Sequence, residues 1–247
     1  MKNAITILIG CLLFSQAWAE QTTIAVAANF TAATREIVPL FEESTGHKIK
    51  ASFGSTGKLY SQIENGAPFD LFLAADTKRP IKAEHEALAV KGSRFTYAKG
   101  KIVLWSITPG LFNAGGTYLK RDGFKHIAIA NPKTAPYGLA AEQVMEKLGL
   151  WNTLQPKLVR GDTISQTFQF IVSGNVQAGF VALSQVKAWM GEQGSYWEIP
   201  QGDYTPIAQQ AVLLKRGKDN AAARAFLDFL QGPQALAVIS SYGYGVE

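Results

Sequence analysis

The sequence predicts an α/β fold of two lobes, each a doubly wound and mostly parallel sheet, with a ligand cleft between the lobes. Strand-like and helix-like segments alternate along the chain, as they do in parallel βαβ units. The pattern places one crossing between the lobes near the strand at residues 101–106, which a Pro109-Gly110 break follows, and a second at the strand that begins at Ile207. We therefore expect lobe I at residues 20–102 and 208–247, and lobe II at residues 103–207.

Lobe I opens with three segments that have the length and the hydrophobic pattern of strands, at residues 24–27, 48–53 and 69–75. A helical pattern follows each strand: residues 30–43, the face that starts at Leu59 and Ile63, and the segment from Asp76 to Ala87. Pro39 conflicts with the first helix, because proline removes a backbone hydrogen bond. Gly46 suits the C-terminal cap of the same helix.

Lobe II repeats the alternation. Its strands are expected at residues 101–106, 127–130, 158–159 and 178–183, and its helices at residues 139–148 and 162–174. Two prolines stiffen the loop before the first of these helices, and Tyr137 lies near the end of this loop. The chain then returns through a strand at residues 207–215. Two final helices, at residues 221–230 and 234–242, are expected to pack on lobe I.

Residues 1–19 have the pattern of a secretory leader. Lys2 gives a positive start, the apolar run that follows is too short to span a membrane, and Ala17-Trp18-Ala19 fits the rule for cleavage. The mature chain is then expected to begin at Glu20. Cleavage before Cys11, as in a lipoprotein, is the alternative, but it would leave only a short apolar run to act as the signal.

The composition excludes several kinds of chemistry. Cys11 is the only cysteine and leaves with the leader, so the mature chain has no thiolate nucleophile, disulfide or cysteine metal site. The leader also removes one lysine, which lowers the formal net charge from +5 to +4. The basic residues are scattered without a run or an aromatic–basic stripe, so a nucleic-acid partner is not expected.

Four turns follow a predicted strand and precede a predicted helix, at Asn29, Thr56, Tyr137 and Ile164. In open α/β sheets, ligands bind at this edge. A helix that starts there directs free backbone N–H groups and the positive end of its dipole at one point, which suits an anion. The alternative is that Asn29 or Thr31 and Thr56 act only as helix caps, and that Tyr137 only packs.

Six segments of the mature chain form a distinctive set: Ala27-Ala28-Asn29-Phe30, Phe53-Gly54-Ser55-Thr56-Gly57-Lys58-Leu59, Gly66-Ala67-Pro68-Phe69-Asp70-Leu71-Phe72, Ala130-Asn131-Pro132 with Ala135-Pro136-Tyr137-Gly138, Gly179-Phe180-Val181-Ala182-Leu183-Ser184, and Gly232-Pro233-Gln234-Ala235. Each segment alone is weak evidence of a family resemblance, whereas the six together are specific. With these segments, the sequence resembles the periplasmic molybdate-binding proteins of molybdate ABC transporters over essentially the whole mature chain.

The resemblance implies a two-lobed periplasmic solute-binding fold of type II that closes on a tetrahedral oxyanion. Backbone N–H groups and hydroxyl groups would hold the oxyanion. The ligand residues carried over by position are Ala28, Asn29, Ser55, Thr56, Tyr137 and Ile164. Molybdenum would enter only as molybdate, with tungstate as a related ligand, and without direct bonds between the protein and the metal. No cofactor is implied.

This chain departs from the family pattern at some of these positions. Asn29 stands where some members have serine, and Thr56 stands where serine is usual. Some members also have a ligand tyrosine at the position of Ala182, so that hydroxyl group is missing here. Tyr137 is absent from those members and is expected to replace it.

The implied function is to capture molybdate in the periplasm and to deliver it to an inner-membrane ABC transporter permease, as a monomer. A sulfate- or phosphate-binding protein is one alternative, and an exported hydrolase is another. The mature chain has no cysteine and no Gly-x-Ser-x-Gly elbow, and His47, His85 and His126 are scattered without metal-ligand spacing. A binding protein is therefore expected, and not an enzyme.

Overall fold

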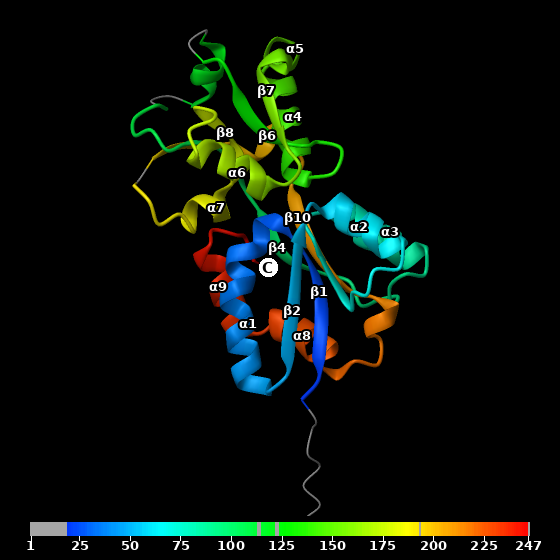
Figure 1. The fold of residues 1–247 in the computed structure, drawn as a ribbon. Helices are drawn as coiled ribbons and strands as arrows, with labels where there is room; N and C mark the ends of the chain where they lie inside the picture. The colour runs from blue at the N-terminus through cyan, green and yellow to red at the C-terminus, as the bar shows by residue number, and fades with distance from the viewer. Residues whose placement is uncertain (1–18, 113–114, 122–123, 193, 247) are drawn as a thin grey trace, which may run out of the picture.

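The computed structural model describes residues 19–112, 115–121, 124–192 and 194–246. The expected secretory leader falls outside these residues apart from Ala19, and so does the alternative cleavage site before Cys11. The described chain forms two lobes, and Figure 1 shows lobe I below lobe II with both termini of the described chain in lobe I.

Lobe I contains a five-stranded sheet with the order β2-β1-β3-β10-β4. The strands are β1 (Gln21–Ala27), β2 (Lys48–Gly54), β3 (Leu71–Ala74), β4 (Phe95–Gly100) and β10 (Ile207–Leu213). β1 runs parallel to β2 and β3, whereas β10 runs antiparallel to β3 and β4. Of these strands, β4 was not predicted from the sequence.

Helices cover both faces of this sheet. The first face carries α1 (Thr31–Thr45), α8 (Ala221–Leu230) and α9 (Pro233–Ser241), and the second carries α2 (Thr56–Glu64) and α3 (Lys78–His85). Side chains alternate along β1, as in any strand. Ile24 and Val26 therefore lie in the first core, and Ala25 lies in the second. The two C-terminal helices pack on lobe I as expected.

Lobe II contains a second five-stranded sheet, with the order β7-β6-β8-β5-β9. Its strands are β5 (Ile102–Ser106), β6 (Ile127–Ala130), β7 (Leu158–Gly161), β8 (Ala178–Ala182) and β9 (Ser195–Glu198). Its helices are α4 (Pro136–Lys147), α5 (Trp151–Leu154), α6 (Ile164–Val172) and α7 (Leu183–Lys187). Short 3-10 turns complete the chain: η1 (Ala28–Phe30), η2 (Gly115–Lys120), η3 (Gln155–Lys157), η4 (Gln201–Asp203) and η5 (Lys215–Gly217).

The two-lobed α/β fold is confirmed, but the sheets are less parallel than expected. Each sheet has two parallel and two antiparallel pairings. The strands that connect the lobes explain this difference. β5 leaves the cleft for lobe II and β10 enters lobe I from the cleft, so each runs against strands that end there. The chain changes sheets at Lys101 and again before Ile207, and the exact lobe limits remain a prediction.

The registers of the parallel pairs position the turns at the cleft. In lobe I the last residues of β1 and β2, Ala27 and Gly54, are direct partners. In lobe II the last residues of β6 and β7, Ala130 and Gly161, are direct partners. Each pair of strands therefore delivers two neighbouring turns to the same edge of its sheet, and the two edges face each other.

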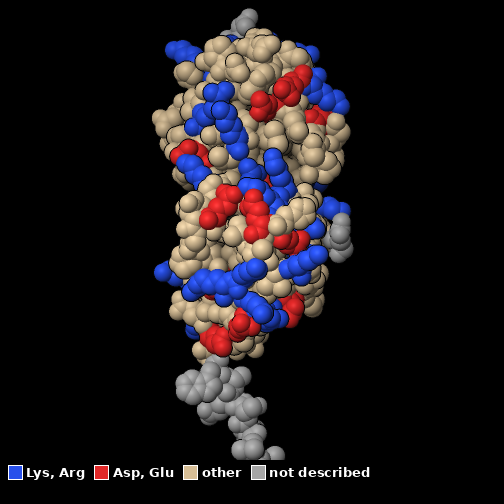
Figure 2. Space-filling model, turned by 90° about the vertical axis from the view of Figure 1, so that its right-hand side faces the viewer, with Lys and Arg blue, Asp and Glu red and all other residues tan. Residues whose placement is uncertain are grey.

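Charged residues are mixed over the surface seen in Figure 2, which shows the side of the molecule that bears α2 and α3. Basic and acidic side chains lie next to one another on both lobes and at the narrow waist between them. This face therefore presents no continuous basic surface of the kind that binds nucleic acid. Within the described part of the chain, no helix is both long and apolar enough to cross a membrane.

Candidate functional site

A small cavity lies between the lobes where the four turns meet. Its lining comes from both lobes: Ala27, Ala28, Asn29, Gly54, Ser55, Thr56, Ala75, Ala135, Pro136, Tyr137 and Ile164. The structure therefore brings together all six residues that the sequence predicts as ligands. None of these lining residues carries a carboxylate, and the described residues contain no cluster of three or more side chains of the metal-ligand type. The lining offers hydroxyl, amide and backbone groups.

Ser55 and Thr56 come from the start of α2. Ser55 occupies the N-cap position in extended backbone, but its side chain makes no capping bond. Its hydroxyl oxygen is buried and has no hydrogen-bond partner. Thr56 is the first residue of the helix, and its Oγ1 accepts a hydrogen bond from Ala75 N over 3.1 Å. Thr56 is thus not a cap, and the proton of its hydroxyl group is available to a ligand.

Ile164 and Ala28 contribute chiefly their backbones. Ile164 begins α6, and the side chain of the preceding residue, Thr163, caps this helix by accepting from Gln166 N over 3.1 Å. The positive end of the α6 dipole is therefore at the cavity. Ala28 begins η1, a 3-10 turn inserted between β1 and α1.

The alternative, that Asn29 or Thr31 caps α1, was wrong. Because η1 precedes the helix, Phe30 takes the N-cap position and no side chain caps it. Thr31 Oγ1 instead donates to Ala28 O over 2.8 Å. Asn29 Nδ2 donates to Gln209 Oε1 over 2.7 Å and to Tyr244 Oη over 3.0 Å. The Asn29 side chain thus joins a buried polar network beside the cavity.

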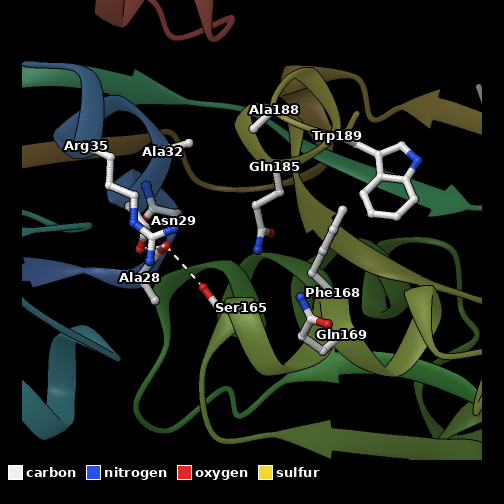
Figure 3. A pocket seen from close by; sticks show the side chains of 11 residues that line it. Ala28, Asn29, Ala32, Arg35, Ser165, Phe168, Gln169, Gln185, Ala188 and Trp189 are labelled. Atoms are coloured by element: carbon white, nitrogen blue, oxygen red, sulfur yellow. Dashed lines mark hydrogen bonds between the residues drawn. The ribbon is translucent and has the colours of Figure 1, made fainter. Parts of the chain in front are cut away.

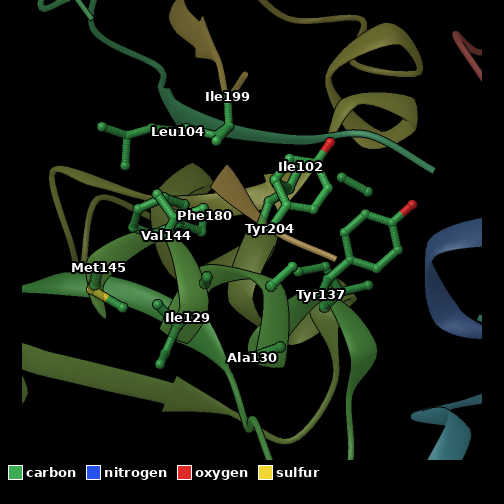
Figure 4. Packing of buried hydrophobic residues seen from close by; sticks show 14 of the residues in the cluster. Ile102, Leu104, Ile129, Ala130, Tyr137, Val144, Met145, Phe180, Ile199 and Tyr204 are labelled. Carbon is green, nitrogen blue, oxygen red and sulfur yellow. The ribbon is translucent and has the colours of Figure 1, made fainter. Parts of the chain in front are cut away.

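Tyr137 lies in the first turn of α4, which begins at Pro136, three residues earlier than the sequence suggested. Pro136 explains the early start, because its fixed φ and missing N–H suit the first turn of a helix. The ring of Tyr137 packs in the core of lobe II, and Figure 4 shows its hydroxyl group pointing away from that core toward lobe I. The oxygen is buried and has no hydrogen-bond partner.

Burial keeps the hydroxyl groups near the cavity protonated. The pKa of Tyr137 is raised well above its ordinary value, chiefly by desolvation, and the nearby Gln209 amide opposes this rise only in part. Desolvation likewise raises the pKa of Tyr244. Both phenols are therefore neutral hydrogen-bond donors near neutral pH.

The lobes are in contact across the cavity. Polar contacts between them include Gly57 N to Thr134 O (2.8 Å), Lys58 Nζ to Asp162 Oδ2 (2.8 Å), Arg79 Nη2 to Lys133 O (3.3 Å), Ser165 Oγ to Ala28 O (3.2 Å), Ser184 Oγ to Asn29 O (3.1 Å) and Tyr244 Oη to Ser184 Oγ (2.9 Å). These contacts define a closed arrangement. The Lys58–Asp162 pair lies at the surface, so it contributes little energy by itself.

A wider groove adjoins the cavity, between α1 of lobe I and helices α6 and α7 of lobe II. Figure 3 shows Arg35 on one wall and Phe168 and Trp189 on the other. Ala28 and Asn29 line both the groove and the cavity. The groove therefore places a basic side chain on a surface that leads toward the cavity.

Sequence reasoning missed several polar residues beside the cavity, namely Ser184, Gln209 and Tyr244. Tyr244 Oη donates to Asn29 O over 2.7 Å and lies 2.9 Å from Ser184 Oγ, so it links the C-terminal segment to lobe II. The only available signal was a polar interruption in the apolar pattern of β10, where Gln209 lies.

Comparisons with known proteins assign the chain to a family. A family model described as bacterial extracellular solute-binding protein matches residues 22–245. The molybdate-binding protein ModA of Azotobacter vinelandii is 55% identical over 237 residues, which cover 96% of this chain and 94% of the relative. The protein of the same name from Rhodobacter capsulatus is 52% identical, over 99% of this chain and 95% of the relative.

A solved structure is also similar. The periplasmic molybdate-binding protein of Azotobacter vinelandii superposes with a TM-score of 0.88 and 42% sequence identity. The match covers 92% of this chain and 99% of that chain.

Proposed function

Because this chain belongs to the bacterial extracellular solute-binding protein family, we propose that it captures molybdate between its lobes and delivers it to an ABC transporter. It is a solute-binding protein and not an enzyme. Two relatives named as molybdate-binding proteins share more than half of their aligned residues with it. Tungstate, which has the same charge and a similar size, is proposed as a second ligand.

The observation that carries this proposal is a pair of buried hydroxyl groups without partners. Ser55 Oγ and Tyr137 Oη come from opposite lobes and line the same cavity. Leaving a buried polar group unpaired costs about 1–3 kcal/mol. An oxyanion in the cavity would accept from both groups and remove this cost.

The other donors complete a cage for a tetrahedral anion. Thr56 offers its hydroxyl proton, and the first turns of α2 and α6 offer backbone N–H groups with the favourable ends of their dipoles. Ala28 and Asn29 would contribute their backbone N–H groups from η1, because both Nδ2 protons of Asn29 already have acceptors. Since donors come from both lobes, the anion favours the closed arrangement over an open one. Molybdenum is then held through oxygen atoms alone.

The absence of a carboxylate from the described lining supports selection against phosphate. Molybdate carries no proton near neutral pH, whereas phosphate still carries one and needs an acceptor. Asp76 and Asp162 are the candidate acceptors nearest to the lining in sequence. Asp76 pairs with Arg79, and Asp162 pairs with Lys58 and has a side chain that is 66% exposed. Sulfate also lacks a proton, but its bonds are shorter, so donors set for the larger anion would lie too far away.

The setting of this function is inferred from the same relatives and from the sequence. We infer a periplasmic location, a leader removed after Ala19 and an inner-membrane permease as the receiving partner. The mature protein is proposed to act as a monomer, because its own two lobes together supply every donor proposed for the anion.

Calorimetric titration with four anions tests this function. Molybdate and tungstate should bind alike, sulfate much more weakly and phosphate weakest. Specificity of this kind is the difference between two binding free energies, so all four titrations should share one buffer and one pH. If phosphate displaced molybdate at equal concentration, the protein would be a phosphate-binding protein instead.

A further inference from the structure

Gln209 lies on β10, the strand by which the chain returns to lobe I. Its side chain is fully buried. Asn29 Nδ2 donates to its Oε1 over 2.7 Å, and Tyr97 Oη lies 3.2 Å from the same oxygen. Its Nε2 has no hydrogen-bond partner. This nitrogen and Tyr137 Oη both lie close to Gly100: a Cβ on Gly100 would stand 2.9 Å from Gln209 Nε2 and 2.1 Å from Tyr137 Oη.

A backbone carbonyl group sets the direction of the hydrogen bonds in this network. Asn29 O can only accept, and its nearer donor is Tyr244 Oη at 2.7 Å, against 3.1 Å for Ser184 Oγ, so the Tyr244 proton is assigned to Asn29 O. Tyr244 has a single proton, so its oxygen can only accept from Asn29 Nδ2 at 3.0 Å. The other proton of Asn29 Nδ2 goes to Gln209 Oε1. The oxygen end of Gln209 is therefore fixed toward Asn29, and its N–H end is turned toward Tyr137.

The orientation of the Gln209 amide determines the direction in which the hydroxyl proton of Tyr137 points. An amide N–H can donate to the phenol oxygen but cannot accept from it. The proton of Tyr137 must then point elsewhere, and the cavity lies on the remaining side. If Gln209 were turned over, its oxygen would face Tyr137 and take this proton.

We propose that Gln209 is a positioning residue for oxyanion binding, because it turns the hydroxyl proton of Tyr137 toward the anion. The proposal rests on the function proposed above. It assigns no contact between Gln209 and the anion. It also explains why a fully buried amide interrupts the apolar pattern of β10.

A double-mutant cycle on molybdate affinity tests the proposal. Glu at position 209 can only accept when it is ionised, so Gln209→Glu should capture the proton of Tyr137. In the parent protein, Tyr137→Phe should weaken binding by roughly ten- to a hundredfold, the usual value of a hydrogen bond to a charged group. In the Gln209→Glu background, the same change should cost less than about twofold, because the hydroxyl group no longer donates to the anion.

Gln210→Glu is the matched control. It places the same charge on the next residue of β10, where Gln210 Oε1 accepts from Arg94 Nη1 over 2.9 Å. This variant should bind within about twofold of the parent, since Arg94 can pair with the new carboxylate and residue 210 does not line the cavity. Thermal unfolding of every variant without molybdate reports on folding separately.

The outcomes separate the two proposals. If the parent does not bind molybdate, the proposed function fails and this inference fails with it. If the parent binds and Tyr137→Phe costs the same in both backgrounds, the function stands and Gln209 does not orient Tyr137. If Gln209→Glu binds molybdate too weakly for titration, the molybdate affinity of Gln209→Met distinguishes orientation of Tyr137 from packing. Retention of affinity within about tenfold of the parent supports orientation, and a loss as complete as that of Gln209→Glu shows that Gln209 only packs.

Discussion

Ser55 and Thr56 are neighbours at the start of α2, yet the structure uses their hydroxyl groups differently. Thr56 Oγ1 accepts a hydrogen bond from Ala75 N, so it stabilises the fold even when no ligand is bound. Ser55 Oγ has no partner, so burying it destabilises the empty protein. A hydroxyl group that serves only as a ligand donor should lower the stability of the empty protein and strengthen the binding of the anion.

We therefore predict opposite stability effects for Ser55→Ala and Thr56→Val. Ser55→Ala should leave the free energy of unfolding of the empty protein unchanged or raised, and should weaken molybdate binding by roughly ten- to a hundredfold. Thr56→Val should destabilise the empty protein by about 1–3 kcal/mol, because the buried Ala75 N–H loses its acceptor. Denaturant unfolding and calorimetry on both variants measure these effects. A destabilised Ser55→Ala with unchanged affinity would make Ser55 structural.

At the same scale, the sequence predicted which residues line the cavity but not where each side chain points. The strand-to-helix turns fix the positions of Asn29, Thr56 and Tyr137, and turns are a local property of sequence. The direction of the Asn29 amide is set by Gln209 and Tyr244, which lie 180 and 215 residues away along the chain. Contacts over such distances leave no pattern in a single sequence.

At the scale of elements, closure depends on how closely α2 can approach the loop before α4. Gly57 N donates to Thr134 O over 2.8 Å, and a Cβ on Gly57 would stand 3.0 Å from both the Cα and the O of Thr134. This contact is tighter than nearly all real Cβ contacts. A side chain at position 57 would therefore hold the lobes slightly apart.

Gly57→Ala should weaken molybdate binding by roughly tenfold, since overpacking costs about 1–3 kcal/mol. The fold of lobe I should be unaffected, because alanine favours a helix more than glycine does. Gly202→Ala is the matched control, as its Cβ would meet nothing within 4 Å. Calorimetry on both variants measures the difference. Equal affinity for Gly57→Ala and the parent would show that this approach does not limit closure.

The prediction of elements was most accurate where the pattern is local. β6 and α8 have the bounds expected from the sequence, and Gly46 caps α1 with a φ of 75°. β4 was not foreseen, and the antiparallel pairings were not either. Both depend on how the chain passes between the lobes, which hydrophobic periodicity does not encode.

At the scale of the whole molecule, the closed arrangement is held by few polar contacts, some of them at the surface. A bound anion would add hydrogen bonds to both lobes at once. We therefore predict that molybdate shifts the protein toward the closed shape. Small-angle scattering should show a smaller radius of gyration with molybdate than without it. Identical curves would mean that the free protein has the closed shape already.

The most direct measurement locates the metal itself. Crystals grown with molybdate, measured at the molybdenum absorption edge, should show one anomalous peak inside the cavity, with an oxygen atom of the anion between the metal and each of Ser55 Oγ and Tyr137 Oη. Its oxygen atoms should contact donors from both lobes, with no protein atom bonded to the metal. A peak in the groove beside Arg35 and none in the cavity would contradict the site described here.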